Sequence, residues 1–430
     1  MKQVFKNIVV SILTLEAKML LRRTKPVIIA ITGSVGKTSV KDAVYTVLKD
    51  RVSVRKTQKS FNSEFGVPLT ILGLPTAWSN PLKWVKNLID GFLIALHPSD
   101  YPDVLVLETG VDRPGDMNRL TSWIKPDIVI VTRLPDVPVH VEYFSSPEAV
   151  IEEKKKLVSA LKADGVLVYN QDDSKIVEIA QGVVQKTIGY SRYSLSEFTA
   201  SSDKVVYEGG KIVGLEFTLT HGKTSTVMRV NGSLGIQHAY NFAAATAVAS
   251  IFEVGVKDAV LALADHEPPP GRMRLIKGIK DTLIIDDTYN SSPIASEQSL
   301  QTLGELRGIK RRIAVLGDML ELGQFSVGEH ERIGSLVPKY ADMLVTIGVR
   351  ARGFSKGALS AGMNQKCILE FDSAVSAGRE VQKFLKEGDV ILVKGSQSIR
   401  AERFVEELMA EPERAEELLV RQGKEWKNIP

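Results

Sequence analysis

The chain has 430 residues, of which 44% are hydrophobic and 25% charged, and its formal charge is +4 at pH 7. This length exceeds what one hydrophobic core normally serves, so we expect two or three domains of an ordinary globular protein whose small charge does not call for a nucleic-acid partner. The single cysteine, Cys367, excludes an intramolecular disulfide and a cysteine-based zinc site, and it fits a cytoplasmic protein.

Residues 1–25 combine apolar side chains at helical spacing with several lysines and arginines. Glu16 and Lys18 interrupt the apolar run well short of the roughly 20 residues that a membrane-spanning helix needs. We predict an amphipathic helix here, and two interpretations stay open. The helix packs on its own domain or on a partner protein, or it lies as a basic helix on the inner face of the membrane.

Residues 26–267 read as a first, central α/β domain. Short buried runs alternate with helical stretches, which predicts a mostly parallel sheet covered on both faces. The expected strands are 27–31, 104–107, 128–131 and 166–169, with helices at 37–48 and 147–161. Between residues 205 and 230 the pattern changes to short alternating segments separated by glycine turns, which indicates hairpins. An alanine-rich helix at 241–252 follows.

Residues 268–430 read as a second, smaller α/β domain. It begins with three prolines and Gly271, the strongest linker signal in the chain. Five buried strands then alternate with helices, at 282–285, 313–316, 343–347, 368–371 and 390–393. This alternation is typical of a Rossmann-like domain.

Residues 32–39 carry the clearest chemical signal, a glycine-containing turn between a buried strand and a helix. Its candidate nucleotide-binding residues are Gly33, Ser34, Gly36, Lys37, Thr38 and Ser39. Backbone N–H groups of such a loop hold nucleotide phosphates, the lysine reaches the β- and γ-phosphates, and the Thr38 hydroxyl binds Mg²⁺. The pattern is a short variant of the Walker loop, and it predicts a P-loop ATPase domain.

Three further polar residues are ambiguous when each is considered alone. Glu108 follows the strand at 104–107, at the edge where open α/β sheets bind ligands, and a carboxylate there suits Mg²⁺. His140 lies in a loop after the strand at 128–131, and a lone histidine is more often structural. Lys154 belongs to a run of three lysines, which usually forms a solvated helix face.

Several longer motifs resemble the Mur ligases, the ATP-dependent amide ligases of cell-wall synthesis. Residues 60–70 are similar to a family pattern Asn-Asn-Glu-x-Gly-x-Pro-Leu-Thr, and residues 286–293 to Asp-Asp-Ser-Tyr-Asn-Ala-Asn-Pro. Residues 316–323 and 394–396 match equally well. The resemblance runs from about residue 26 to 407. Within the family it is nearest to the subgroup that adds D-alanyl-D-alanine to a muramoyl tripeptide.

The resemblance implies a role for each candidate residue. Lys37 and Thr38 would bind ATP and a first Mg²⁺ ion, while Glu108 and His140 would hold a second. Lys154 would be carbamylated, since CO₂ converts a neutral amine into an anionic carbamate that can coordinate Mg²⁺. The remaining nucleotide contacts would be Asn241, Arg272 and Asn290. Lys37, His140 and Lys154 are thus the expected catalytic residues.

The chain also departs from the family pattern. Residues 132–134 read Thr-Arg-Leu where Thr-Asn-Ile is usual, only Asn241 of a Gly-x-His-Asn-x-x-Asn motif clearly carries over, and Gln397 replaces an arginine. Family members carry an N-terminal domain that grips the UDP end of the precursor. Only about 25 residues precede the first expected strand here, so we expect the usual UDP-binding domain to be lacking.

The implied reaction is ADP-forming amide ligation through an acyl phosphate. The expected substrates are ATP, a carboxylate peptidoglycan precursor and a D-alanyl-D-alanine-like amine. Two alternatives stay open: a Mur-like ligase for another acid and amine, and a nucleotide-dependent binding protein without ligation. The retention of Lys37, Glu108, His140 and Lys154 together favours catalysis.

Overall fold

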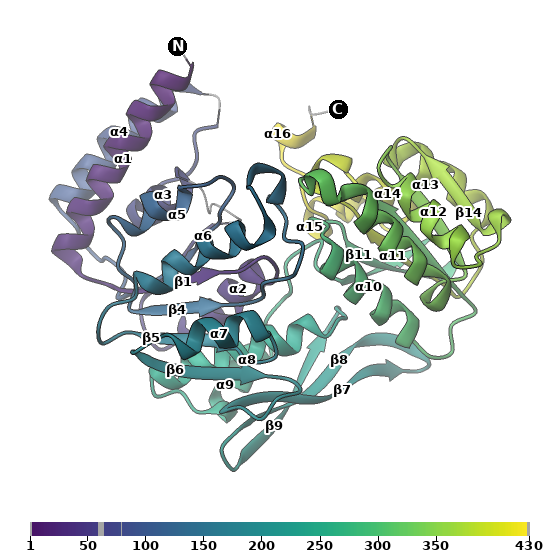
Figure 1. Cartoon of the computed structure of the whole chain (residues 1–430), viewed down its shortest axis with the longest axis horizontal. Coiled ribbons are helices and arrows are strands. Elements are labelled where there is room, and N and C mark those ends of the chain that lie inside the picture. Colours follow the sequence, from purple (N-terminus) through teal and green to yellow (C-terminus); the bar gives the residue numbers. More distant parts are fainter. Residues whose placement is uncertain (1, 59–63, 79, 428–430) are drawn as a thin grey trace.

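The computed structural model describes residues 2–58, 64–78 and 80–427. Its strands form two sheets that lie side by side (Figure 1). The nine-stranded sheet contains β1 (Val27–Thr32), β2 (Val54–Lys56), β3 (Val104–Glu108), β4 (Ile128–Val131), β5 (Val166–Asn170), β6 (Lys186–Ser191), β7 (Phe198–Glu208), β8 (Lys211–His221) and β9 (Thr224–Asn231). The six-stranded sheet contains β10 (Arg274–Gly278), β11 (Thr282–Asp287), β12 (Arg311–Gly317), β13 (Met343–Ile347), β14 (Ile368–Phe371) and β15 (Asp389–Lys394). The α/β fold class predicted from the sequence is therefore confirmed.

The order of the first sheet places a binding crevice at the end of β1. The order is β2-β3-β1-β4-β5-β6-β7-β8-β9, and β1 pairs in parallel with both β3 and β4. The chain therefore adds strands on one side of β1 and then on the other. Ligands of open α/β sheets bind where the strand order reverses, outside the carboxyl ends of the strands. The loop after β1 lies at this point.

Alternating side chains of the central strands explain why helices cover both faces of the sheet. Ile29 and Ile31 of β1 point into a core shared with α2 (Lys37–Leu48), α8 (Gln237–Ile251) and α9 (Val256–Leu263). Ala30 points to the opposite face and packs with α5 (Asp116–Thr121), α6 (Pro147–Ser159) and α7 (Ser174–Gln181). Both faces are buried, as expected of parallel strands that are apolar throughout.

The second sheet has the order β10-β11-β15-β12-β13-β14, in which all pairs are parallel except β10 with β11. Its helices are α10 (Pro293–Glu305), α11 (Ser326–Tyr340), α12 (Arg352–Ser360), α13 (Ala374–Phe384), α14 (Glu402–Leu408), α15 (Ala415–Leu418) and α16 (Lys424–Lys427). The domain boundary predicted between residues 267 and 268 falls between α9 and β10, and it stays a prediction.

Two parallel helices, α1 (Lys2–Thr24) and α4 (Pro81–Leu96), project at one corner of the first sheet (Figure 1). Val9, Leu13, Ala17 and Leu20 of α1 are buried in a core shared with α3 (Gly66–Leu72) and α4. Arg23 at the end of α1 donates to the carbonyl oxygens of Ala95 and Leu96 at the end of α4. Among the described residues, no helix combines the length and apolar character needed to cross a membrane.

The elements whose bounds were predicted from the sequence lie within a few residues of those bounds. The helix expected at 37–48 has those bounds, and the strands expected at 128–131, 343–347 and 368–371 do too. Helix α4 had no counterpart among the expected elements, and α8 begins at Gln237, four residues before the predicted 241. Part of the motif at 60–70 lies outside the described residues, which omit 59–63.

Candidate functional site

The loop between β1 and α2 requires its two glycines. Gly33 and Gly36 have φ angles of 137° and 91°, which side chains rarely allow. A Cβ atom on Gly33 would lie 2.0 Å from the hydroxyl oxygen of Thr132. Gly36 is the N-cap residue of α2 and has no side chain to cap the first turn. The amide groups at this helix end therefore remain available for a phosphate.

Two lysines converge on the backbone of this loop. The side-chain nitrogens of Lys37 and Lys154 donate to the carbonyl oxygen of Gly33, at 2.8 and 3.3 Å. Lys154, on α6, is only 3% exposed. Burial, with a smaller contribution from the charge of Lys37, lowers its pKa to about 7. Burial also lowers the pKa of Lys37, which nearby Glu108 opposes. Lys154 is therefore not the solvated lysine that its run of neighbours suggested.

Thr38 and Glu108 meet across the carboxyl ends of β1 and β3. The Thr38 hydroxyl donates to the Glu108 carboxylate at 3.2 Å, and both side chains are buried. The Nζ atom of Lys41 lies 3.8 Å from the second oxygen of Glu108. A hydroxyl and a carboxylate oxygen beside a phosphate loop are ligands that Mg²⁺ favours.

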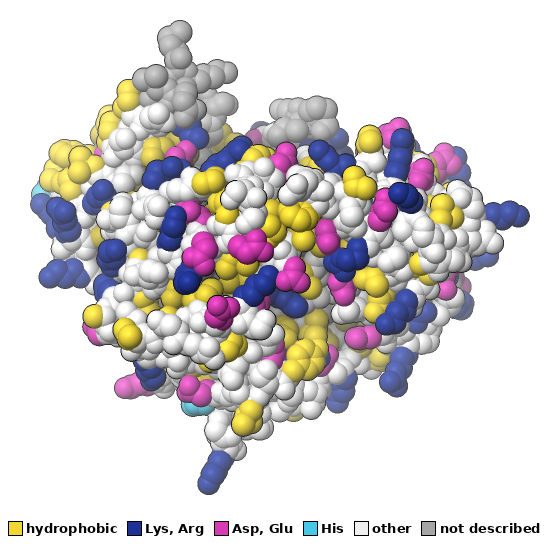
Figure 2. Space-filling view, viewed as in Figure 1, with side chains coloured by type: hydrophobic (Ala, Val, Ile, Leu, Met, Phe, Trp, Pro, Cys, Tyr) yellow, Lys and Arg dark blue, Asp and Glu magenta, His cyan; other side chains and the backbone are white. Residues whose placement is uncertain are grey.

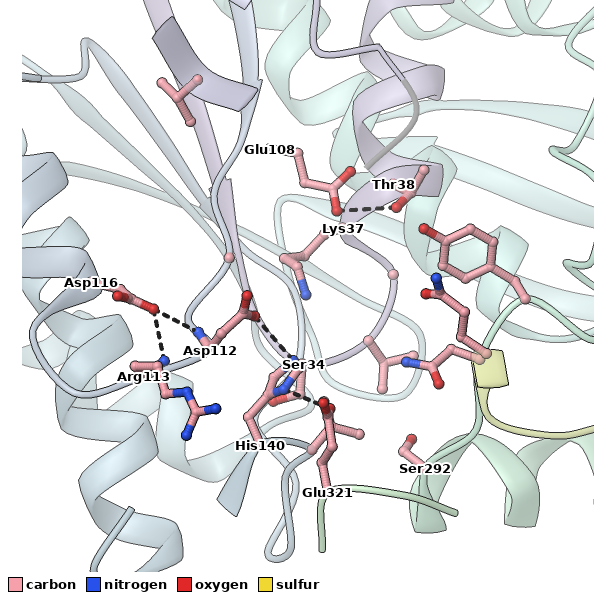
Figure 3. Close-up of a pocket in the computed structure, with 18 of the residues that line it drawn as sticks. Ser34, Lys37, Thr38, Glu108, Asp112, Arg113, Asp116, His140, Ser292 and Glu321 are labelled. Carbon is pink, nitrogen blue, oxygen red and sulfur yellow. Dashed lines mark hydrogen bonds and ion pairs between the residues drawn. The ribbon is translucent and has the colours of Figure 1, made fainter. Parts of the chain in front are cut away.

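His140 contacts two other carboxylates instead of Glu108. Its Nδ1 atom lies 2.7 Å from Glu321 and its Nε2 atom 3.5 Å from Asp112. Figure 3 shows these contacts on one side of Lys37 and the Thr38–Glu108 pair on the other. Glu321 belongs to the second sheet's domain, and contact with His140 lowers its pKa. His140 thus bridges the two halves of the molecule.

Arg272 extends from the segment before β10 to the phosphate loop. Its guanidinium lies 3.9 Å from the centre of the Tyr289 ring, and one of its nitrogens lies 3.5 Å from the Thr38 hydroxyl. Gly271 has a φ of 70°, and a Cβ atom there would lie 2.9 Å from the backbone nitrogen of Tyr289. The close turn at Gly271 therefore places Arg272 over the ring.

Several buried polar atoms at this site have no hydrogen-bond partner within the described part of the chain. They include the Ser34 hydroxyl, the side-chain nitrogen of Asn241 and the Nε atom of Arg272. Buried polar atoms are normally satisfied, so such a group marks the place of a ligand or water. Together with the open helix end, they fit the phosphates of a bound nucleotide.

Asn290 lies in a second polar cluster that faces the same cavity. Its backbone carbonyl accepts a hydrogen bond from Lys394 at 3.0 Å, and Lys394 forms a buried ion pair with Asp287 at 2.6 Å. Ser299 donates to the same Asp287 carboxylate. These contacts fix the loop after β11 and hold Asn290 at the cavity wall.

One cavity of about 1520 Å³ joins these groups. From the central sheet it is lined by the expected residues Ser34, Gly36, Lys37, Thr38, Ser39, Glu108, His140 and Asn241, and from the other side by Arg272 and Asn290. Gly33 and Lys154 lie behind this wall and are not part of the lining. The volume is large enough for a nucleotide and a second ligand.

The structure brings together some, but not all, of the residues that were expected to bind metal. Thr38 and Glu108 are brought together, whereas His140 pairs with Asp112 and Glu321 and Lys154 with Gly33. No cluster of three or more histidine, cysteine or acidic side chains suited to a metal occurs in the described ranges. The four-residue metal set therefore stays a prediction, and only the Thr38–Glu108 part has a geometric basis.

Sequence reasoning missed four residues of the site: Asp112, Tyr289, Glu321 and Lys394. Three of them lie within motifs at 286–293, 316–323 and 394–396 that carry the family resemblance. The motifs were therefore the available signal, although they did not reveal that Glu321 reaches His140. Asp112 follows Glu108 by four residues and had no motif of its own.

Comparisons with known families agree with this architecture. The model of the Mur ligase middle domain matches residues 31–249, and that of the Mur ligase glutamate ligase domain matches residues 271–397. The first of these alone covers half of the chain.

Individual relatives are similar over most of the chain. The UDP-N-acetylmuramoyl-tripeptide–D-alanyl-D-alanine ligase of Bacillus subtilis is 28% identical over 92% of this chain and 79% of its own length. The ligase of that name from Mycobacterium leprae is 30% identical, over 86% and 71%. The crystal structure of MurF ligase from Thermotoga maritima in complex with ADP superposes with a TM-score of 0.77 at 25% identity, covering 94% of this chain and 84% of that one.

Proposed function

The chain belongs to the Mur ligase family, and from this premise we propose that it joins D-alanyl-D-alanine to UDP-N-acetylmuramoyl-tripeptide at the expense of ATP. The observation that carries the proposal is the cavity in which a phosphate loop with unsatisfied polar atoms faces Arg272 and Asn290 of the second domain. The proposed pair of substrates is the one given in the names of the similar ligases.

The first step forms an acyl phosphate. A carboxylate oxygen of the tripeptide attacks the γ-phosphorus of ATP, the bond from that phosphorus to the β-phosphate oxygen breaks, and ADP leaves. Lys37 and the amide groups at the start of α2 lie where they would hold the phosphates. Arg272 approaches Thr38 from the other side, so its charge would stabilise the phosphoryl group during transfer.

The second step forms the amide. The neutral amino group of D-alanyl-D-alanine attacks the acyl carbon, a tetrahedral intermediate forms, and phosphate leaves as the nitrogen loses a proton. An acyl phosphate would hydrolyse in bulk water, so the reaction needs an enclosed site. The contact of His140 with Glu321 joins the two halves of the molecule beside the phosphate loop, and it would help to close the site.

The residues of this site fit Mg²⁺ in part. The Thr38 hydroxyl and the Glu108 carboxylate would hold an ion, which when bound would offset the negative charge that collects on the transferred phosphoryl group. A second ion held by His140 remains part of the proposal, and it would require His140 to exchange Asp112 or Glu321 for the metal.

Carbamylation of Lys154 also belongs to the proposal. The amine is buried behind the phosphate loop, and its pKa of about 7 leaves much of it neutral at physiological pH, which is the form that reacts with CO₂. A carbamate on Lys154 would carry a negative charge next to Lys37, because the Nζ atoms of Lys37 and Lys154 both donate to the carbonyl oxygen of Gly33.

A cytoplasmic location is the setting that this reaction requires, because ATP is supplied there, and the single cysteine suits that compartment.

The direct test combines the purified full chain with ATP, Mg²⁺ and UDP-N-acetylmuramoyl-tripeptide, with and without D-alanyl-D-alanine. We expect phosphate release that depends on the amine, and a pentapeptide product by mass spectrometry. Lys37→Ala should abolish both signals, while Lys49→Ala, at the far end of α2, should leave them unchanged.

Three other outcomes would favour different functions or a different site. Turnover with another acid or amine, and none with this pair, would favour a Mur-like ligase of different specificity. Tight ATP binding without turnover on any acid and amine would favour a nucleotide-dependent binding protein. Activity that survives Lys37→Ala would show that the phosphate loop is not the site of chemistry.

A further inference from the structure

The corner formed by α1 and α4 exposes an unusual amount of apolar surface. Nineteen large hydrophobic side chains are exposed among the described residues, and ten of them lie on these two helices or at Trp78 just before α4. On α1 they are Phe5, Ile8, Ile12 and Leu15, and on α4 Leu82, Val85, Ile89, Phe92 and Leu93. We call these nine side chains the α1–α4 surface. Contiguous apolar patches on a folded protein usually mark an interaction site.

The spacing of these residues shows that the exposure is systematic. Residues 5, 8, 12 and 15 of α1 follow one helical stripe, which is distinct from the buried stripe of Val9, Leu13 and Leu20. On α4, Leu82, Ile89 and Leu93 lie opposite the buried Asn87 and Gly91. Leu82 is 81% exposed and Ile89 is 57% exposed. Helix α4 therefore has an apolar outer face as well as an apolar inner one.

Basic residues outnumber acidic residues on these two helices. Lys83 and Lys86 on α4, and Arg22, Arg23 and Lys25 at the end of α1, are all exposed. The only acidic residues within the two helices are Glu16, which is buried, and Asp90, which is paired with Lys86. Figure 2 shows the hydrophobic side chains gathered over this corner, with lysine and arginine side chains beside them.

We propose that the α1–α4 surface docks the enzyme onto an anionic lipid bilayer. An apolar helical face rimmed by lysine and arginine is the chemistry of helices that lie in the membrane interface. The apolar side chains enter the acyl boundary, and the cations contact the negative head groups. A second copy of the chain suits this surface less well, because a symmetric interface would set the same basic rim against itself.

Helix α1, which forms part of the docking surface, also borders the cavity. Thr14, Leu15 and Lys18 of α1 line it, and Leu15 belongs to the α1–α4 surface as well. Docking through this surface therefore brings one edge of the cavity close to the lipid head groups. Docking depends on this surface alone and not on which acid and amine the enzyme joins.

The test is cosedimentation of the full chain with vesicles of phosphatidylcholine alone and of phosphatidylcholine with phosphatidylglycerol. We expect binding to the anionic vesicles that weakens with added salt, because charge contributes to it. The triple variant Leu82→Gln, Ile89→Gln, Leu93→Gln should bind at least about tenfold more weakly. A control variant with Val184→Gln, Leu195→Gln, Leu261→Gln changes apolar residues elsewhere that are 71% to 96% exposed, and it should bind like the wild type.

Circular dichroism and ATP binding of each variant establish that it is folded. Failure of the wild type to bind either kind of vesicle would overturn the proposal, as would equal weakening by both triple variants. Equal binding to neutral and anionic vesicles would also overturn it, because the basic rim would then play no part. If sedimentation velocity without lipid shows a dimer that only the α4 variant disrupts, and vesicles are not bound, the surface joins two copies instead.

Discussion

Lys37 and Lys154 share one acceptor, the carbonyl oxygen of Gly33, although they lie on different helices. Burial makes the charge of Lys154 costly, and repulsion by the nearby ammonium group of Lys37 adds to that cost. Lys154 therefore relinquishes its proton more readily, and its pKa falls to about 7. The same contact places the Lys154 amine directly behind the phosphate loop.

Replacing Lys154 tests its carbamylation. We expect Lys154→Ala to lower turnover by at least about 10-fold to 100-fold, as loss of a metal-site residue commonly does. Lys155→Ala is the matched control, since Lys155 is exposed and pairs with Glu152.

In ¹³C-bicarbonate, the wild type should show a carbamate resonance that Lys154→Ala lacks. At constant dissolved CO₂ this resonance should grow as the pH rises through about 7, because only the neutral amine reacts. A resonance that persists in Lys154→Ala would contradict the assignment.

Arg272 should act through the geometry of its guanidinium. Arg272→Lys keeps the charge but loses the planar group that covers Tyr289 and reaches Thr38. We expect turnover with saturating ATP to fall by roughly 10-fold or more, as loss of a charge-stabilising contact would require. The variant should melt at the wild-type temperature, and Arg274→Lys on β10 serves as the control. Unchanged turnover would show that Arg272 does not contact the transferred phosphate.

The contact between His140 and Glu321 should hold the two halves of the molecule together. Removing the carboxylate in Glu321→Ala takes away the contact with His140 and keeps the backbone hydrogen bond from the Glu142 N–H group to the Glu321 carbonyl oxygen. We expect a larger radius of gyration by X-ray scattering and a higher KM for ATP. Glu411→Ala removes a glutamate that pairs with Arg414 in its own loop, and it should change neither quantity. Identical scattering profiles for Glu321→Ala and wild type would rule out a joining role.

Glu16 should make the α1–α4 corner sensitive to pH. Burial raises its pKa from 4.5 to about 7, so the folded state retains a proton that the unfolded state loses. The resulting stabilisation is complete below about pH 4.5 and disappears as the pH rises through about 7. Between pH 5 and pH 8, hydrogen exchange of α1 and α4 should accelerate in the wild type beyond the intrinsic change. Glu16→Gln should remove most of that excess, while exchange in α11 should be the same in both proteins.

The local pattern of the sequence was sufficient to predict the phosphate loop. A buried strand, two glycines and a helix occur within 22 residues, from Val27 to Leu48, and each depends mainly on its own neighbours. The positive φ angles at Gly33 and Gly36 follow from the turn itself. The same is true of the strands that match their predicted bounds, since uninterrupted apolar runs between turns are a local property.

Contacts between distant segments could not be predicted from the sequence pattern. Lys154 is 121 residues from the carbonyl group that it meets, and its three-lysine run suggested a solvated helix face. His140 was expected beside Glu108, but the docking of the second domain presents Glu321 to it. These outcomes depend on strand order and domain packing, which no single stretch of residues encodes.

By itself, the sequence determined the two α/β halves, the nucleotide loop and the family motifs, because these rest on local periodicity, glycine geometry and ordered residue patterns. Only the tertiary structure decided that Lys154 is buried against the loop, that His140 joins two domains, and that α4 turns an apolar face outward beside α1. The physical reason is that burial and charge pairing are properties of the surroundings of a side chain, and those surroundings are assembled only when remote segments pack together.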